Sequence, residues 1–361
     1  LENWTSSKDF FEEMVEWGLD PNSFKSTDFT EMALIHPDDE ITTPRSDRIA
    51  FRIVERGTDE HCIDQGFKRM ALEAGATIHY NSKADPKDCT IIAAGPKDTS
   101  AIAFGEVFKT SFPNHVSFQL NDKLAPGAYS YLIVIDGVGL ICTCLWRKQK
   151  NSNRYLNETI ACYEKLYPEL DREPIKRVGG KGDFSIPSTY FANEQYFVGE
   201  AGGLQDFMWG FGMRYAVTSG VMAANCLLNG TNYDAQIRKE LLPLIKLSAT
   251  NRMLMNRIGD RGFKRIAKYW MKHQRKNGND GLLFMERIYQ PSIIRRMLWP
   301  ITNRLLLRKV TYSNGRFGRR MPFRKALKRD NWTMSERGKE ISEEWKKIRA
   351  SGGNVSFTES D

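Results

Sequence analysis

The sequence predicts a mixed α/β (α+β) fold, because helical and β-type segments alternate in its first part, a β-rich block follows, and helical patterns fill the rest. At 361 residues, the chain is long enough for two or three substructures. Its composition, 41% hydrophobic and 27% charged, argues against global disorder. We therefore expect a folded protein of several parts.

The first part, residues 1–96, alternates helical and β-type patterns. A helix is expected at 7–18, capped by Ser7 and stopped by Gly18. The apolar run 89–94, closed by Gly95-Pro96, is typical of a strand that is buried on both faces. The segments expected between them are strands at 31–36 and 48–55 and a helix at 59–74.

The rest of the chain divides into three further parts. Residues 97–190 are expected to form a β-sheet domain that also contains a helix at 153–167. Residues 191–230 combine a short buried strand, a glycine-rich turn and a helix. Residues 231–361 are expected to be a basic region of helices and loops, in which the last dozen residues are disordered.

Cysteine usage and hydropathy exclude several classes of protein. The six cysteines form no CxxC pair and no zinc-like spacing, so we interpret them as free thiols in a reducing compartment. The longest apolar run, 129–146, contains Asp136 and two glycines, which favours strands over a membrane-spanning helix. The first seventeen residues have no signal-peptide pattern. These features predict a cytoplasmic protein, peripheral on a membrane if it binds one.

The net charge of +9 is concentrated in one segment, because residues 261–330 contain 20 Lys or Arg and only three acidic residues. Within this segment, residues 292–309 alternate apolar clusters with basic residues, and such a helix can lie in the headgroup layer of an anionic membrane. A helix packed on the protein with a solvated basic face explains the pattern equally well. Pro300 would kink or split this helix. Because no recognition motif accompanies the charge, we expect no nucleic-acid partner.

The most informative stretch is 196–224, YFVGEAGGLQDFMWGFGMRYAVTSGVMAA. It places a strand, an acidic residue after a glycine, a glycine-rich turn and a small-faced helix in succession. Glycines let the backbone approach a ligand closely, and the free N–H groups of a helix start favour negative charge. A reduced flavin is such a ligand, because it gathers negative charge near N1 and the C2 carbonyl. A turn that serves only the fold is the alternative interpretation.

This stretch resembles the GDAAG…GxGI..A..SG..AA motif of geranylgeranyl reductases and related flavin monooxygenases and halogenases. The resemblance implies a partial, discontinuous FAD-binding Rossmann-like domain, with Glu200 near the ribityl chain and the amides after Gly210 at the flavin pyrimidine edge. Glu200 replaces the family's aspartate, and the segment 203–206 replaces a common proline. The cofactor-binding candidates that follow from the match are Gly199, Glu200, Ala201, Gly210, Phe211, Gly212 and Met213.

Two further segments agree with the same family in order and distance. Residues 54–95 resemble its stretch from an arginine-ended strand, through a helix ending in Gly-Ala, to a strand-end turn, which makes Gly95 and Arg56 candidate neighbours of FAD. A plain turn for Gly95 and a surface salt bridge for Arg56 are the alternatives.

Residues 126–133, PGAYSYLI, resemble the PxxYxWxF motif of geranylgeranyl reductases, with Pro126 and Tyr129 matching and Tyr131 in place of the tryptophan. Alternate residues of a strand share one face, where these aromatic rings would line a channel for an isoprenoid chain or serve as sheet core.

The resemblance covers roughly residues 29–228. The family opens with a βαβ unit that bears GxGxxG and an acid for the adenosine ribose, and no GxGxxG occurs in this sequence. We therefore expect that an N-terminal segment is missing and that the chain as given binds FAD weakly or not at all.

The function that the resemblance implies is FAD-dependent reduction of carbon–carbon double bonds in a polyprenyl group of a hydrophobic isoprenoid or lipid substrate. NAD(P)H or an electron donor protein such as ferredoxin would supply the electrons, and an anionic membrane surface is an expected partner. The proton donor is not identified by the sequence. The alternatives are an FAD-dependent monooxygenase or halogenase, and an inactive membrane-binding module created by truncation.

Overall fold

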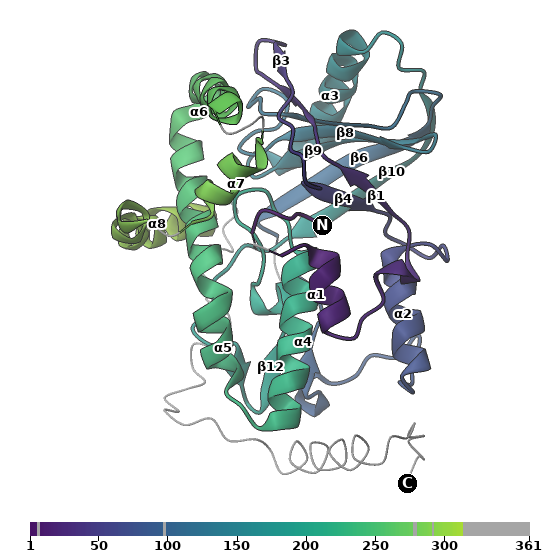
Figure 1. The fold of residues 1–361 in the computed structure, drawn as a ribbon, viewed down its shortest axis with the longest axis vertical. Coiled ribbons are helices and arrows are strands. Elements are labelled where there is room, and N and C mark those ends of the chain that lie inside the picture. The colour runs from purple at the N-terminus through teal and green to yellow at the C-terminus, as the bar shows by residue number, and fades with distance from the viewer. Residues whose placement is uncertain (6–7, 97–98, 277–279, 291, 313–361) are drawn as a thin grey trace.

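A computed structural model describes the chain apart from residues 6–7, 97–98, 277–279, 291 and 313–361 (Figure 1). The last dozen residues, for which the sequence predicts disorder, lie outside the described part. Helices and strands are mixed throughout, so the predicted α/β (α+β) class is confirmed. Figure 1 shows the large sheet on one side of the molecule, with α1, α2 and α4 below it.

The large sheet has seven strands in the order β10-β6-β9-β8-β7-β2-β3. Neighbouring strands are antiparallel except for β2 and β7, which are parallel. Two of its strands, β2 and β3, come from the first 96 residues. The strand bounds are β2 Ala33–Ile35, β3 Ile41–Thr42, β6 Ala101–Lys109, β7 His115–Gln119, β8 Ser130–Ile135, β9 Val138–Leu145 and β10 Glu173–Gly182.

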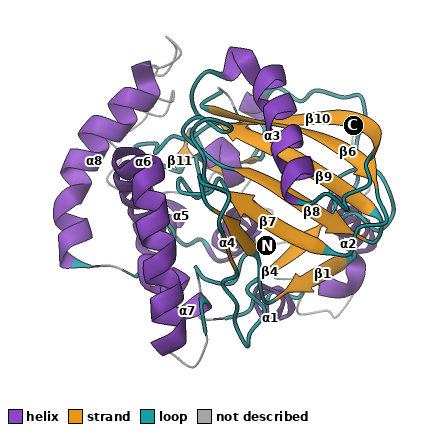
Figure 2. Ribbon diagram, turned by 90° about the horizontal axis from the view of Figure 1, so that it is seen from above, coloured by secondary structure: helices purple, strands orange, loops and turns teal. Residues whose placement is uncertain are grey.

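The two faces of this sheet carry different layers. Helix α3, Ser152–Leu166, covers one face (Figure 2) and packs Leu156 and Tyr163 against sheet residues such as Leu132 and Ile141. Residues of the opposite face, including Tyr129, pack against the C-terminal helices. The candidate site therefore forms on the face away from α3.

A three-stranded sheet, β11-β12-β5, carries the strand that leads to the glycine-rich turn. Its strands are β5 Ile91–Ile92, β11 Phe191–Ala192 and β12 Gln195–Phe197, with β12 parallel to β5. The expectation that 89–94 is a strand buried on both faces is wrong, because β5 is short and Ile91 is 37% exposed. Successive side chains of a strand point to opposite faces, and here the face with Ile92 (8% exposed) is covered while the face with Ile91 is not.

The N-terminal helices pack against the start of the small-faced helix α4, Met213–Asn229. Helix α1, Phe10–Glu16, begins after Asp9 rather than at the predicted cap Ser7, because the Asp9 carboxylate accepts the Phe11 N–H (2.8 Å). Helix α2, Ile63–Glu73, and the short strand pair β1, Ser26–Phe29, and β4, Phe51–Val54, complete this part. One core cluster joins α1, α2 and α4.

In the described part of the chain, α4 is followed by four helices: α5 Tyr233–Glu240, α6 Leu242–Lys276, α7 Leu282–Ile288 and α8 Ile293–Tyr312. Helix α6 consists of two segments joined at Gly259, whose φ of 54° and ψ of −164° are not helical. The split that the sequence allows at Pro300 does not occur, since Pro300 lies inside α8. Within the described residues, no helix combines the length and the apolar character that a bilayer crossing requires.

Candidate functional site

The turn after β12 and the start of α4 lie in close contact. The Gly199 N–H donates to Ser219 Oγ on α4 (2.8 Å). Gly199 has a φ of +53°, and a Cβ at this position would lie 3.1 Å from the Ala216 side chain. Glycine is thus required by both conformation and space. This packing brings the short 3₁₀ turn at Gly199–Gly202, with Ala201 buried within it, beside the first turns of α4.

The N-terminus of α4 has the electrostatic character that an anionic ligand needs. Its cap, Gly212, provides no side-chain hydrogen bond, and no acidic residue lies in the first turn. The amides there carry the positive end of the helix dipole. Gly210 is exposed with a φ of +79°, while Phe211, Gly212 and Met213 are half-buried. The helix start is therefore not sealed within the core.

Glu200 is held in place by hydrogen bonds from the neighbouring backbone and side chains. Its Oε1 accepts the Asp183 N–H (2.8 Å) and a Gln205 Nε2–H (3.2 Å). Partial burial raises the pKa of the Glu200 carboxyl, and these hydrogen bonds oppose that shift. Both hydrogen bonds use Oε1, so only Oε2 of Glu200 would be free to accept a hydrogen bond from a ribityl hydroxyl. That role of Glu200 stays a prediction.

Tyr129 connects the large sheet to the turn before α4. Its hydroxyl donates to the Trp209 carbonyl (2.5 Å), and the two rings pack with centroids 5.9 Å apart. The Tyr131 ring lies 6.1 Å from the Tyr129 ring, so the predicted shared face is confirmed. Pro126 fixes the approach to β8, because its carbonyl accepts the Trp146 N–H (3.2 Å). The two segments that resemble family motifs therefore meet at Trp209.

A buried carboxyl closes the turn that leads into α4, and sequence reasoning did not find it. Asp206 Oδ2 accepts the Trp209 N–H (2.5 Å), and Asp206 Oδ1 accepts the Tyr289 hydroxyl (2.7 Å). Its backbone bonds to Gly210 and Phe211 across the same turn. Burial raises the pKa of Asp206 to about 6. Asp206 thus positions the glycines at the helix start.

A buried arginine, also missed, lies on the other side of this turn. Arg252 of α6 donates through Nη1 to the Met208 carbonyl (3.1 Å) and lies 4.5 Å above the Trp146 ring. Burial lowers its pKa to about 10, and within the described residues its Nε and Nη2 have no hydrogen-bond partner. One signal was present in the sequence: Arg252 continues the helical spacing of the buried residues Ile245 and Ala249.

Gly95 and Arg56 have different relations to this site. Gly95 lies three residues beyond β5, and Gly199 lies two residues beyond the parallel strand β12, so both leave the same end of the small sheet. Arg56 forms an exposed ion pair with Asp64 (2.7 Å), which is the surface salt bridge that the sequence allows. No contact in the described residues joins Arg56 to the α4 start.

A cavity of about 400 Å³ lies along α4, between α1, α5 and the beginning of α6. Its lining includes Glu13, Arg214, Tyr215 and Gln236 but none of the predicted cofactor residues. The Trp4 ring packs on the Phe211 ring, with centroids 5.8 Å apart, and Trp4 does not line the cavity. The cavity is therefore separate from the predicted flavin site.

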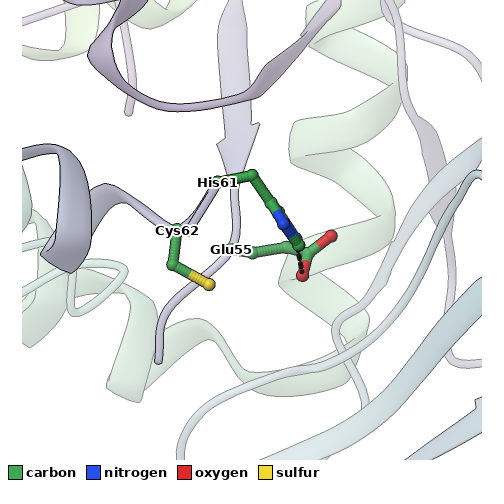
Figure 3. A group of neighbouring side chains, drawn as sticks. All are labelled: Glu55, His61 and Cys62. Atoms are coloured by element: carbon green, nitrogen blue, oxygen red, sulfur yellow. Dashed lines mark hydrogen bonds and ion pairs between the residues drawn. The ribbon is translucent and has the colours of Figure 1, made fainter. Parts of the chain in front are cut away.

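Glu55, His61 and Cys62 bring three potential metal ligands within 4.8 Å of one another (Figure 3). Glu55 Oε2 lies 3.1 Å from His61 Nε2, an exposed pair. Burial and the nearby Glu55 carboxylate raise the pKa of the Cys62 thiol, which disfavours the thiolate that a metal needs. A structural zinc site has four ligands, and the described residues provide three. The group is best described as a His–Glu pair beside a buried thiol.

The sequence and the fold were compared with those of known proteins. No protein-family model and no curated protein matches the sequence. A solved structure of a flavin-dependent brominase triple mutant matches with a TM-score of 0.51 and 11% identity, over 84% of this chain and 91% of that chain. p-Nitrophenol 4-monooxygenase from Pseudomonas putida matches with a TM-score of 0.50 and 11% identity, over 78% and 88%. A geranylgeranyl bacteriochlorophyll reductase-like protein from Thermoplasma acidophilum has a TM-score of 0.47 and 16% identity, over 84% and 88%.

The first two matches show that the chain has the fold of flavin-dependent halogenases and monooxygenases. This is the fold that the resemblance in the sequence implies. At these sequence identities the likeness establishes the fold alone. Any activity has to be argued from the residues of the candidate site.

Proposed function

We propose that this chain is an FAD-dependent oxidoreductase that reduces carbon–carbon double bonds of a polyprenyl, geranylgeranyl-type group. One observation carries the proposal: the hydrogen bond from Tyr129 to the Trp209 carbonyl, which joins the aromatic strand face to the turn that leads into the start of α4. A ligand stacked at that helix start would lie next to an apolar surface suited to a hydrocarbon chain.

We expect the residues at the start of α4 to hold the cofactor. The amides of Phe211, Gly212 and Met213 would face the pyrimidine edge of a flavin, where the helix dipole favours negative charge, and Glu200 would accept from the ribityl chain. When bound, reduced FAD would supply hydride from N5, with NAD(P)H or a ferredoxin as the source of electrons.

The chain's own residues would orient the substrate and exclude water. Tyr129 is buried and its pKa is raised well above the usual value by that burial, so it stays a neutral hydrogen-bond donor. Its ring, with those of Tyr131 and Phe118, forms an aromatic surface on the sheet (centroids 5.7 to 6.1 Å apart). An isoprenoid chain would pack against such a surface without needing polar partners.

The second candidate function is an FAD-dependent monooxygenase or halogenase, and it is favoured by the names of two matching structures with TM-scores of 0.51 and 0.50. Product analysis separates the two. Saturation of a geranylgeranyl chain under anaerobic conditions supports reduction. Oxygen-dependent consumption of NAD(P)H with a hydroxylated or halogenated product, and no saturated product, would refute it.

The flavin site itself is tested by substitution of Gly212. A Cβ there would lie 3.5 Å from Gln205, which is ordinary contact, and its φ of −129° suits any residue, so Gly212→Ala should fold normally. We expect the flavin affinity of the chain, already weak, to fall roughly tenfold or more, because the methyl group would lie where the proposal puts the isoalloxazine edge against the amides. Titrations of the full chain with FAD and FMN, followed by flavin fluorescence, measure this change.

Gly220→Ala is the matched control, because Gly220 lies on the same helix and a Cβ there would meet no atom within 4 Å. It should leave flavin affinity unchanged and slightly stabilise α4. Equal weakening by both substitutions, or flavin affinity that neither changes, would place the flavin somewhere other than the α4 start.

A further inference from the structure

The outer face of α8 exposes large apolar side chains together with arginines. Ile293, Ile294 and Met297 are 76%, 71% and 72% exposed, and Ile301 is 47% exposed. At 3.6 residues per turn, these four positions fall within an arc of about 100°. Exposed apolar residues are normal when scattered, but four on one helical face form a contiguous patch.

The opposite face of α8 is already occupied by the protein. Trp299 and Leu305 pack against the core cluster that includes α5 and the beginning of α6, and Thr302 is fully buried. Both Figure 1 and Figure 2 show α8 on the outer side of α6, away from the sheets. The apolar arc thus faces outward from a helix that the rest of the fold holds in place.

The charges around this arc are of one sign. Arg296 is exposed beside the arc, Arg304 is exposed within it one turn beyond Ile301, and α8 contains no Asp or Glu. A symmetric dimer through this face would bring the arginines of α8 against those of a second α8, with no acidic residue of that helix to pair with them, which is unfavourable. An anionic lipid surface offers both an apolar layer for the isoleucines and methionine and phosphate groups for the arginines.

We propose that α8 docks the protein on an anionic lipid bilayer, with Ile293, Ile294, Met297 and Ile301 entering the headgroup–acyl boundary and Arg296 and Arg304 contacting lipid phosphates. The helix lies in the membrane plane and does not cross it, in agreement with its basic composition. This inference goes beyond the flavin chemistry, and its test needs no flavin.

The experiment measures cosedimentation of the full chain with vesicles. The chain should bind vesicles of phosphatidylcholine with phosphatidylserine more tightly than phosphatidylcholine alone, and added salt should weaken binding. The double variant Ile294→Asp/Met297→Asp should bind at least roughly tenfold more weakly, because it removes two apolar contacts and adds two charges that the lipid repels. Its melting temperature should stay unchanged, because both side chains are exposed.

The matched control is Val15→Asp/Ile175→Asp, which makes the same change in net charge at exposed apolar positions on α1 and β10 (62% and 49% exposed). It should retain most of the vesicle binding. Binding that both double variants weaken equally, or no binding by the unaltered chain, would overturn the proposal. So would size-exclusion behaviour showing a dimer that only the α8 variant dissociates, because the occupant of the face would then be a second copy.

Discussion

Replacing Arg214 with alanine is expected to lower the free energy of unfolding by about 3–5 kcal/mol, the usual cost of removing one partner from a buried ion pair. Arg214 Nη2 lies 2.7 Å from Glu13 Oε2, and Nη1 donates to the Glu2 carbonyl (2.8 Å). Both side chains are largely buried, so water cannot replace the lost donors. Denaturant unfolding followed by circular dichroism measures the difference.

The loss of stability should depend on the burial of the ion pair and on the several N–H donors of the guanidinium group. Arg56→Ala removes an ion pair of the same length, 2.7 Å, but on the surface, and should cost less than about 1 kcal/mol. The stability loss in Arg214→Lys should lie between those of Arg214→Ala and Arg56→Ala, because lysine keeps the charge but cannot donate from two separate nitrogens. If Arg214→Ala proves no more costly than Arg56→Ala, the N-terminal segment does not dock on α4 as the structure has it.

Local patterns made the elements around the candidate site predictable. The strand at 196–199, the glycine turn and the helix to about residue 228 appear as β12, the Gly199–Gly202 turn and α4 because glycine and helix-face signals act over a few residues. The shared face of Tyr129 and Tyr131 followed from the two-residue period of a strand.

The features that sequence patterns missed depend on distant partners. Asp206 is bonded to Tyr289, 83 residues away, and no local pattern encodes that contact. The run 89–94 has the composition of a buried strand, but the exposure of Ile91 depends on whether another element packs over that face of β5. Local sequence reports what a segment can form, while burial and pKa are set by what surrounds it.

Asp206 should make stability depend on pH in the direction opposite to that of most carboxylates. Burial raises its pKa from 3.8 to about 6, so the folded state holds the proton more tightly than the unfolded state. The stabilisation is fully present below the unfolded pKa and is lost as pH rises through about 6, a total of about 3 kcal/mol. Ion-paired carboxyls with lowered pKa, such as Asp9 and Asp64, contribute in the opposite sense.

These contributions overlap in pH. The difference in unfolding free energy between the unaltered chain and Asp206→Asn therefore isolates the contribution of Asp206. Asparagine keeps an acceptor for the Trp209 N–H but cannot ionise. As pH rises from about 4.5 to 6.5, the unfolding free energy of Asp206→Asn should therefore increase by about 2 kcal/mol relative to that of the unaltered chain. Unfolding free energies measured across this range give the difference curve. A flat curve would mean that Asp206 ionises normally and is not buried.

Tyr289→Phe distinguishes a titration from a purely structural effect. The Tyr289 hydroxyl donates to Asp206 Oδ1 and thereby holds the carboxyl pKa down against burial. Without that donor, the ionised form loses a hydrogen bond, so the pKa of Asp206 should rise further and the midpoint of the difference curve should move to higher pH. A simple packing defect would lower stability equally at all pH values and leave the midpoint in place. The direction of this shift therefore reports whether the carboxyl that closes the turn before α4 is held by the hydrogen bonds that the structure gives it.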